Sequence, residues 1–207
     1  VGMMSGGLDS MLAMKIIMAQ GIHVTALHFH TGFSYIDLNQ AVGSKEINTI
    51  DAQRAAELLD VPLAIIDVAD PYISIVLHPR FGYGSGMNPC VDCRIFLLRQ
   101  AKAWMEQHGY HFVFTGEVVG QRPMSQHKPT LRTVARESGL EGYLLRPLSA
   151  KLLQPTVPEQ RGWVDREKLY AISGRGRKKQ IALAKQFGIT EYAQPSGGCC
   201  YLIQKVY

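Results

Sequence analysis

The chain lacks most of the features that mark membrane-spanning or disulfide-stabilised proteins. None of its apolar runs approaches the roughly 20 residues that a helix needs to cross a bilayer, so we expect no membrane segment. We also find no secretory leader pattern, internal repeat or low-complexity tract. Only four cysteines occur among 207 residues, a length at which a core forms without disulfide staples. These absences favour a globular protein of the cytoplasm. Because the first residue is Val rather than Met, the chain can be a piece of a longer protein.

Positive charge is concentrated in the last third of the chain. The whole chain has a net charge of +5, whereas residues 146–186 contain ten Lys and Arg against three Asp and Glu. The remainder is therefore slightly acidic. A basic segment on a nearly neutral body favours a polyanionic partner such as nucleic acid. A solvated basic face is the alternative, and the composition leaves the two open.

Strand-like and helix-like apolar patterns alternate along the chain. This alternation predicts right-handed βαβ units and a parallel sheet, with ligands bound beyond the carboxyl ends of the strands. We therefore expect a Rossmann-like α/β fold with helices on both faces of the sheet. We assign residues 1–150 to an ATP-binding domain, for reasons given below, and residues 151–207 to a basic extension that packs on it. The expected strands are 1–4, 22–29, 62–68, 111–115 and 144–145, and the expected helices are 8–20, 45–59, 70–77, 94–108, 164–172 and 178–187.

A glycine-containing turn, SGGLDS, stands between the first expected strand and the first expected helix. Gly6 and Gly7 permit a tight turn that brings the backbone close to a ligand, and the helix start offers unpaired amides to an anion. Ser5 and Ser10 add hydroxyl donors, and Asp9 can hold Mg²⁺ beside a phosphate. No Gly-Lys-Ser/Thr follows, so the turn is not a Walker loop. We predict a phosphate site here.

Three segments together give the chain a resemblance to a known family. SGGLDS resembles the pyrophosphate-binding loop of the PP-loop ATP pyrophosphatases, which transfer AMP to a carbonyl or carboxylate oxygen. TGEVVGQRPMSQ at 115–126 and LRPL at 145–148 resemble segments of the tRNA 4-thiouridine synthetases in that family. The resemblance implies that the loop binds ATP and that the region of His28 lines the adenosine pocket. Gly116, Glu117 and Gln121 follow the fourth strand, where Gln121 can hydrogen-bond the adenylate or a base edge and Glu117 can orient Mg²⁺ or accept a proton.

Three of the four cysteines are candidates for one reactive site. Cys90 and Cys93 form a CxxC that we expect just before a helix, whose N-terminus favours thiolates, and Cys199 follows a Gly-Gly turn. Three thiolates suit a 4Fe-4S cluster with one iron open to sulfide, and the resemblance to PP-loop thiolases implies such a cluster. Persulfide or disulfide chemistry and a zinc site remain alternatives. We expect Cys200 to lie outside the site as a buried apolar residue.

Together these features predict an ATP-dependent tRNA sulfurtransferase. A base carbonyl of a tRNA uridine would be adenylated, and sulfur held by Cys90, Cys93 and Cys199 would displace AMP, with Asp9 as a further catalytic residue. The sulfur would come from sulfide or a cysteine desulfurase. We expect RNA contacts from the basic segment, through Arg175, Arg177, Lys178 and Lys179.

Two other functions stay open at this point. A PP-loop ligase would add ammonia or an amine to a small-molecule adenylate, and an ATP-binding module would sense the nucleotide without turnover. The sequence also leaves the oligomeric state open, with a homodimer as one option.

Overall fold

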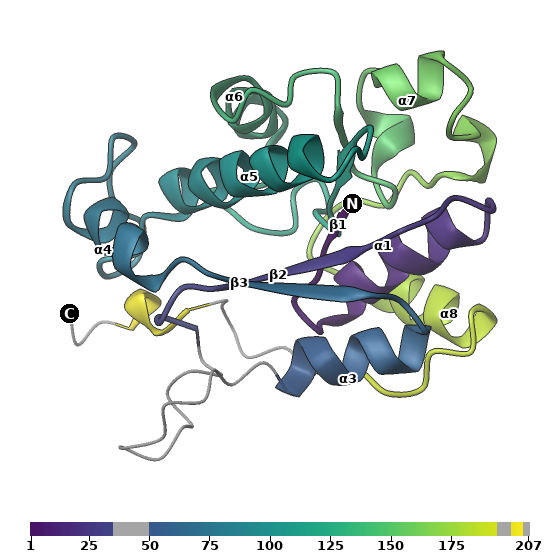
Figure 1. Ribbon diagram of the computed structural model, residues 1–207, viewed down its shortest axis with the longest axis horizontal. Coiled ribbons are helices and arrows are strands. Elements are labelled where there is room, and N and C mark those ends of the chain that lie inside the picture. Colours follow the sequence, from purple (N-terminus) through teal and green to yellow (C-terminus); the bar gives the residue numbers. More distant parts are fainter. Residues whose placement is uncertain (35–49, 194–199, 205–207) are drawn as a thin grey trace.

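The chain folds around a parallel sheet, shown in the computed structural model of Figure 1, which describes residues 1–34, 50–193 and 200–204. The strands of this sheet are β1 (Gly2–Met3), β2 (Ala26–His30), β3 (Leu63–Asp67), β4 (Val113–Phe114) and β5 (Leu144–Leu145). Their order across the sheet is β3-β2-β1-β4-β5. From β1 the chain moves outward to β3, and it then returns to the other side of β1 to form β4 and β5. The order therefore reverses between β1 and β4, the place where open α/β sheets bind their ligands.

Helices cover both faces of this sheet, so the Rossmann-like α/β prediction is confirmed. On one face, Ala26 and Phe114 pack in a core cluster with α1 (Leu8–Met18), α3 (Ile50–Leu59) and α8 (Lys178–Gln186) (Figure 1). On the other face, Leu27 and Val113 pack with α5 (Cys90–Gln107) and α6 (Lys128–Glu137). Neighbouring strand residues reach opposite faces because successive side chains alternate. The helices are α1 (Leu8–Met18), α3 (Ile50–Leu59), α4 (Ala69–Leu77), α5 (Cys90–Gln107), α6 (Lys128–Glu137), α7 (Val157–Gln160) and α8 (Lys178–Gln186), with 3₁₀ turns at Ala150–Leu152, Arg166–Lys168 and Tyr201–Ile203.

The C-terminal segment packs into the core on the face of the sheet that α1 and α3 cover. Leu183 and Ala184 of α8 belong to the same buried cluster as Leu12 of α1. The helix predicted over 164–172 is wrong, because the backbone N–H groups of Tyr170 and Ile172 bond to the carbonyls of residues 147 and 148 instead. Only the short 3₁₀ turn at 166–168 forms there. Within the described ranges, no helix is both long enough and apolar enough to cross a bilayer.

Candidate functional site

The SGGLDS loop connects β1 to α1 and is held in shape by its own serines. The Ser10 hydroxyl donates to the Gly7 carbonyl at 2.7 Å and accepts from the Ser5 backbone N–H at 3.3 Å. Ser10 is 6% exposed, whereas Ser5 lies on the exposed side of the turn. The Ser10 side chain thus fixes the conformation of the loop, and Ser5 is the serine that faces outward.

Two glycines allow close approach of the loop to other segments. Gly6 has a φ of +77°, and a Cβ built there would lie 2.5 Å from the backbone of Asp51 in α3. A Cβ on Gly116 would lie 2.4 Å from the carbonyl oxygen of Asp9. A larger residue at either position would have to displace backbone atoms. The loop is therefore packed between the start of α3 and the segment that follows β4.

Asp9 is the meeting point of three segments that are distant in sequence. Its Oδ2 accepts a 2.9 Å hydrogen bond from Gln121 Nε2 and lies 3.7 Å from the guanidinium of Arg177. Its Oδ1 is buried and has no hydrogen-bond partner in the described part of the chain. A carboxylate oxygen left in this state suits a hard cation such as Mg²⁺. The structure thus joins Asp9 and Gln121, both predicted to face ATP, with Arg177, which was predicted to face RNA.

His28 links the second strand to the end of the first. Its Nδ1 lies 3.0 Å from the carbonyl oxygen of Met4, which can only accept, so Nδ1 carries the proton. The ring is half-buried beside the start of the loop. His28 therefore lies at the carboxyl edge of the sheet as expected, and its contact with adenosine stays a prediction.

Glu117 carries a buried charge that two arginines balance. Its Oε2 accepts hydrogen bonds from Arg146 Nε at 2.9 Å and from the Thr115 hydroxyl at 3.1 Å. Arg94 Nε of α5 lies 3.4 Å from Oε1. Burial raises the pKa of Glu117, but the charges of Arg146 and Arg94 outweigh burial and bring the pKa below its ordinary value. The carboxylate is thus paired with two arginines, and its role toward Mg²⁺ stays a prediction.

Cys90 and Cys93 lie inside the first turn of α5, and not before the helix as predicted. Pro89 is the N-cap, and its carbonyl accepts from the Cys93 N–H at 2.8 Å. Both cysteines are half-buried. The helix N-terminus still favours their thiolate forms. Arg94, the next residue, links this turn to Glu117.

Cys200 is buried in a small apolar cluster, as expected. The cluster also contains Tyr72, Val76 and Leu202, and Cys93 packs against it. Cys199 lies outside the described residues, so the three-cysteine site stays a prediction. Among the residues that are described, no group of three or more His, Cys, Asp or Glu side chains could hold a metal ion.

The basic residues at the start of α8 differ in exposure. Arg175, Lys178 and Lys179 are exposed, whereas Arg177 is half-buried against Asp9. Contact of the exposed three with RNA stays a prediction. The position of Arg177 depends on folding across most of the chain, and no local pattern in the sequence indicates it.

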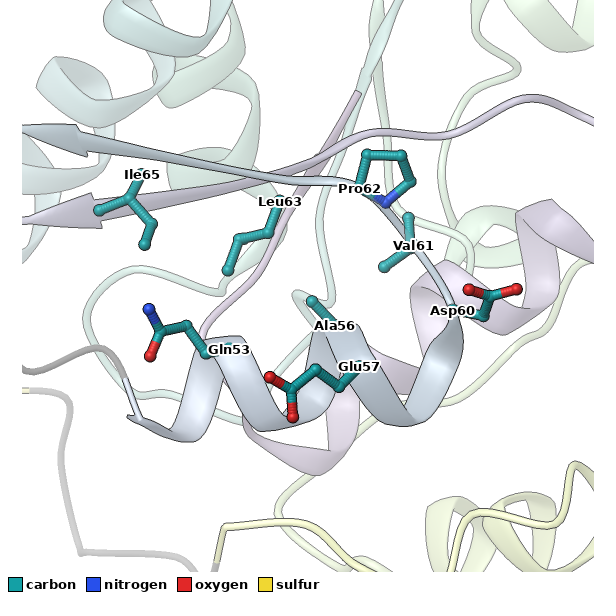
Figure 2. Close-up of a pocket in the computed structure, with 8 residues that line it drawn as sticks. All are labelled: Gln53, Ala56, Glu57, Asp60, Val61, Pro62, Leu63 and Ile65. Carbon is teal, nitrogen blue, oxygen red and sulfur yellow. The ribbon is translucent and has the colours of Figure 1, made fainter.

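A hollow of about 500 Å³ lies away from the loop, between α3 and the edge strand β3 (Figure 2). Its lining includes the carboxylates of Glu57 and Asp60, which disfavour a polyphosphate. None of the predicted site residues lines it. The residues that do are Gln53, Ala56, Glu57, Asp60, Val61, Pro62, Leu63 and Ile65.

The chain is similar to tRNA-modifying enzymes over a limited length. It is 32% identical over 101 residues to the tRNA-specific 2-thiouridylase MnmA of Thermotoga petrophila, which covers 45% of this chain and 28% of that enzyme. The enzyme of the same name from Clavibacter sepedonicus is 28% identical over 157 residues, which covers 72% and 39%. The chain thus spans well under half the length of these relatives.

A solved structure and a family description complete the comparison. The NMN synthetase of Francisella tularensis aligns with a TM-score of 0.43 and 13% identity, covering 94% of this chain and 88% of that one. The family described as tRNA methyl transferase HUP domain matches residues 1–203. The chain therefore belongs to this HUP-domain family, within the PP-loop ATP pyrophosphatases.

Proposed function

We propose that the protein activates a base carbonyl of a tRNA uridine with ATP and replaces the carbonyl oxygen by sulfur. The observation that carries the proposal is the environment of Asp9 in the SGGLDS loop. Gln121 and Arg177 face one oxygen of its carboxylate, and the other is buried without a hydrogen-bond partner among the described residues. This arrangement suits a polyphosphate and its cation. The relatives are named tRNA-specific 2-thiouridylases, which supports the choice of substrate and of sulfur as the incoming atom.

The loop would bind the pyrophosphate part of ATP. α1 begins at Leu8, and its N-cap, Gly7, has no side chain that could occupy the first amides of the helix. These amides and the positive end of the helix dipole favour an anion at this end. Mg²⁺ fits at Asp9 Oδ1, and when bound it would neutralise part of the phosphate charge. The hydrogen bond from Gln121 keeps the carboxylate in one orientation.

The first chemical step would be adenylation of the base. The carbonyl oxygen attacks the α-phosphorus of ATP, the bond to the bridging oxygen breaks, and pyrophosphate leaves. Fixed N–H donors of the loop stabilise the negative charge that builds on the pyrophosphate. The base then carries AMP on its former carbonyl oxygen. AMP is a much better leaving group than an oxide, so the ring carbon becomes open to a sulfur nucleophile.

The second step would deliver sulfur from Cys90, Cys93 and Cys199. A persulfide on one cysteine attacks the adenylated carbon and AMP leaves, after which a second thiolate breaks the S–S bond. The products are a thiocarbonyl on the base and a protein disulfide, which a thiol reductant resets. A cysteine desulfurase refills the persulfide after this reset. Free sulfide can refill it instead by attacking the protein disulfide before reduction, which gives one persulfide and one thiolate. Three thiolates also match the number that a 4Fe-4S cluster needs, and such a cluster would supply iron-bound sulfide in place of the persulfide.

Pyrophosphate release tests the proposal most simply. With ATP, Mg²⁺, sulfide and unmodified tRNA, the protein should release pyrophosphate and AMP in equal amounts and form a thionucleoside detectable by mass spectrometry. Asp9→Asn should abolish both products and leave the circular dichroism spectrum unchanged. Iron and acid-labile sulfide analysis after anaerobic purification separates cluster from persulfide chemistry. Turnover with ammonia and a small acid but not with tRNA, or ATP binding without pyrophosphate release, would contradict the proposal.

A further inference from the structure

The four basic residues at the start of α8 do not face the same way. The guanidinium of Arg177 lies 3.7 Å from Asp9 Oδ2, and 31% of its side chain is exposed. Its neighbours Arg175, Lys178 and Lys179 are exposed to solvent. One residue of the basic segment therefore lies on the SGGLDS loop, while the other three lie on the outer surface.

Non-local backbone pairing brings this segment to the loop. Ser173 forms a parallel bridge with Val119, and the Gly174 N–H donates to the Val119 carbonyl at 2.8 Å. The buried hydroxyl of Ser149 also forms hydrogen bonds with both of these chain segments. It accepts from the Val119 N–H at 3.0 Å and donates to the Ile172 carbonyl at 2.6 Å. The position of Arg177 is thus set by several bonds in the protein interior.

A carboxylate beside a phosphate site repels the phosphate unless a positive group balances it. Asp9 is 14% exposed, and its hydrogen-bond donor, Gln121, is neutral. The guanidinium of Arg177 supplies the positive charge from 3.7 Å, a distance too long for a hydrogen bond to Asp9 Oδ2. Asp9 therefore does not occupy the five N–H donors of Arg177. A planar guanidinium that keeps such donors is well suited to two parallel contacts with phosphate oxygens.

Gln180 is a second polar side chain near this end of α8 whose polar atoms have no hydrogen-bond partner among the described residues. It lies three residues after Arg177, on the same side of the helix, and it shares the buried face that packs against α1. Its side chain is fully buried, and neither polar atom of its amide has a hydrogen-bond partner among the described residues. Asp9 Oδ1 is likewise buried and has no hydrogen-bond partner among the described residues. Buried polar atoms without partners are rare in folded proteins, and a ligand or ordered water usually satisfies them.

We propose that Arg177 is a nucleotide-binding residue that contacts the terminal phosphates of ATP, whereas Arg175, Lys178 and Lys179 face RNA. This inference rests on the proposed use of ATP by the same loop. The terminal phosphates are the relevant part of the ligand, because Arg177 lies on Asp9, within the stretch that would hold the pyrophosphate. The start of α8 then carries an inner residue for the nucleotide and outer residues for the tRNA.

Binding of ATP and AMP, each with Mg²⁺, tests the inference in four proteins: wild type, Arg177→Ala, Arg177→Lys and Lys179→Ala. Arg177→Ala should weaken ATP binding about tenfold or more, because it removes a charged donor to phosphate. AMP binding should stay unchanged, since AMP lacks the terminal phosphates. Arg177→Lys keeps the charge and should recover part of the loss. Lys179→Ala is the matched control, which should bind ATP normally and lower the salt slope of tRNA binding by about one unit.

Four results would overturn the inference. If Arg177→Ala binds ATP as the wild type does and instead loses a unit of tRNA salt slope, Arg177 belongs to the RNA surface. Equal losses of ATP and AMP affinity with a lower melting temperature would indicate a structural role. If the wild type binds no ATP, both the inference and the proposed function fail. If the wild type releases pyrophosphate and Arg177→Ala keeps its ATP affinity, only the inference fails.

Discussion

The side-chain amide of Gln121 donates a 2.9 Å hydrogen bond to the carboxylate of Asp9 across 112 residues of sequence. Asp9 follows β1, and Gln121 follows β4, the neighbouring strand on the side where the strand order reverses. The bond therefore connects the two halves of the sheet at the place where the strand order reverses. It also makes the orientation of Asp9 depend on a residue from the second motif of the chain.

Gln121→Glu should weaken ATP binding more than Gln121→Met does. The Glu variant has nearly the same shape but places a second carboxylate beside Asp9, and this added negative charge repels the polyphosphate. The Met variant removes only the hydrogen bond, which is worth about 1.5–3 kcal/mol when it is made to a charged group. Equilibrium binding of ATP with Mg²⁺ to both variants checks this order. Equal affinities would mean that the phosphates do not approach Asp9.

Glu117→Gln should destabilise the fold at neutral pH by about 3–5 kcal/mol, because it leaves the buried charge of Arg146 without its ion-pair partner. The folded state holds the pKa of Glu117 below its ordinary value, because the charges of Arg146 and Arg94 outweigh the effect of burial. The carboxylate therefore stabilises the fold above that ordinary pKa, and the contribution is lost as the pH falls through the folded pKa.

Urea unfolding of wild type and Glu117→Gln at several pH values measures this effect. The difference in the free energy of unfolding should be full at pH 7 and should shrink under strongly acidic conditions. Glu191→Gln is the control, because its ion pair with Arg54 is exposed and should contribute little. A difference that stays constant with pH would show that the charge of Glu117 is not the source of its stabilising effect.

Gly116→Ala should disturb the loop directly. The added methyl carbon would lie 2.4 Å from the Asp9 carbonyl oxygen, which is backbone and has no rotamer by which to move aside. We expect a loss of about 1–3 kcal/mol of stability and of most pyrophosphate release. Gly176→Ala is the matched control, since a Cβ there meets no atom within 4 Å. Normal turnover by Gly116→Ala would mean that this approach of two backbones is not needed for catalysis.

Cysteine variants should divide into two groups. Cys90→Ser, Cys93→Ser and Cys199→Ser should each abolish thionucleoside formation. Cys200→Ala should retain it and lower only the melting temperature, because Cys200 packs in an apolar cluster with Tyr72. Mass spectrometry of digested tRNA and thermal unfolding give the two readouts. Loss of thiolation in Cys200→Ala with retention in Cys199→Ser would reverse the assignment.

The elements that form the sheet could be predicted because their signals are local. The apolar runs before SGGLDS and before the second motif became β1 and β4, and the alternation of strands and helices was enough to predict a parallel sheet. α6 was missed, because only Leu131 and Val134 of its ten residues are buried and most of the rest of its sequence is polar. The helix predicted over 164–172 does not form, because its backbone donors bond to a distant segment.

The candidate site could be predicted in part, for the same reason. The loop and Gln121 stand in recognisable motifs, so their residues could be named without a structure. The contact of Arg177 with Asp9 joins residues far apart in the chain, and the basic run around Arg177 suggested RNA instead. The balance of Glu117 by Arg146 and Arg94 is likewise visible only after folding.

Transfer of oxygen from the base to AMP tests the central claim most directly. The substrate would be unmodified tRNA transcribed with uridine that carries ¹⁸O in both carbonyl groups, incubated with the protein, ATP, Mg²⁺ and sulfide. If the base carbonyl is adenylated and then displaced by sulfur, each AMP formed should contain one ¹⁸O atom, and the pyrophosphate should contain none. AMP without label, formed while the tRNA keeps all of its ¹⁸O, would contradict the account.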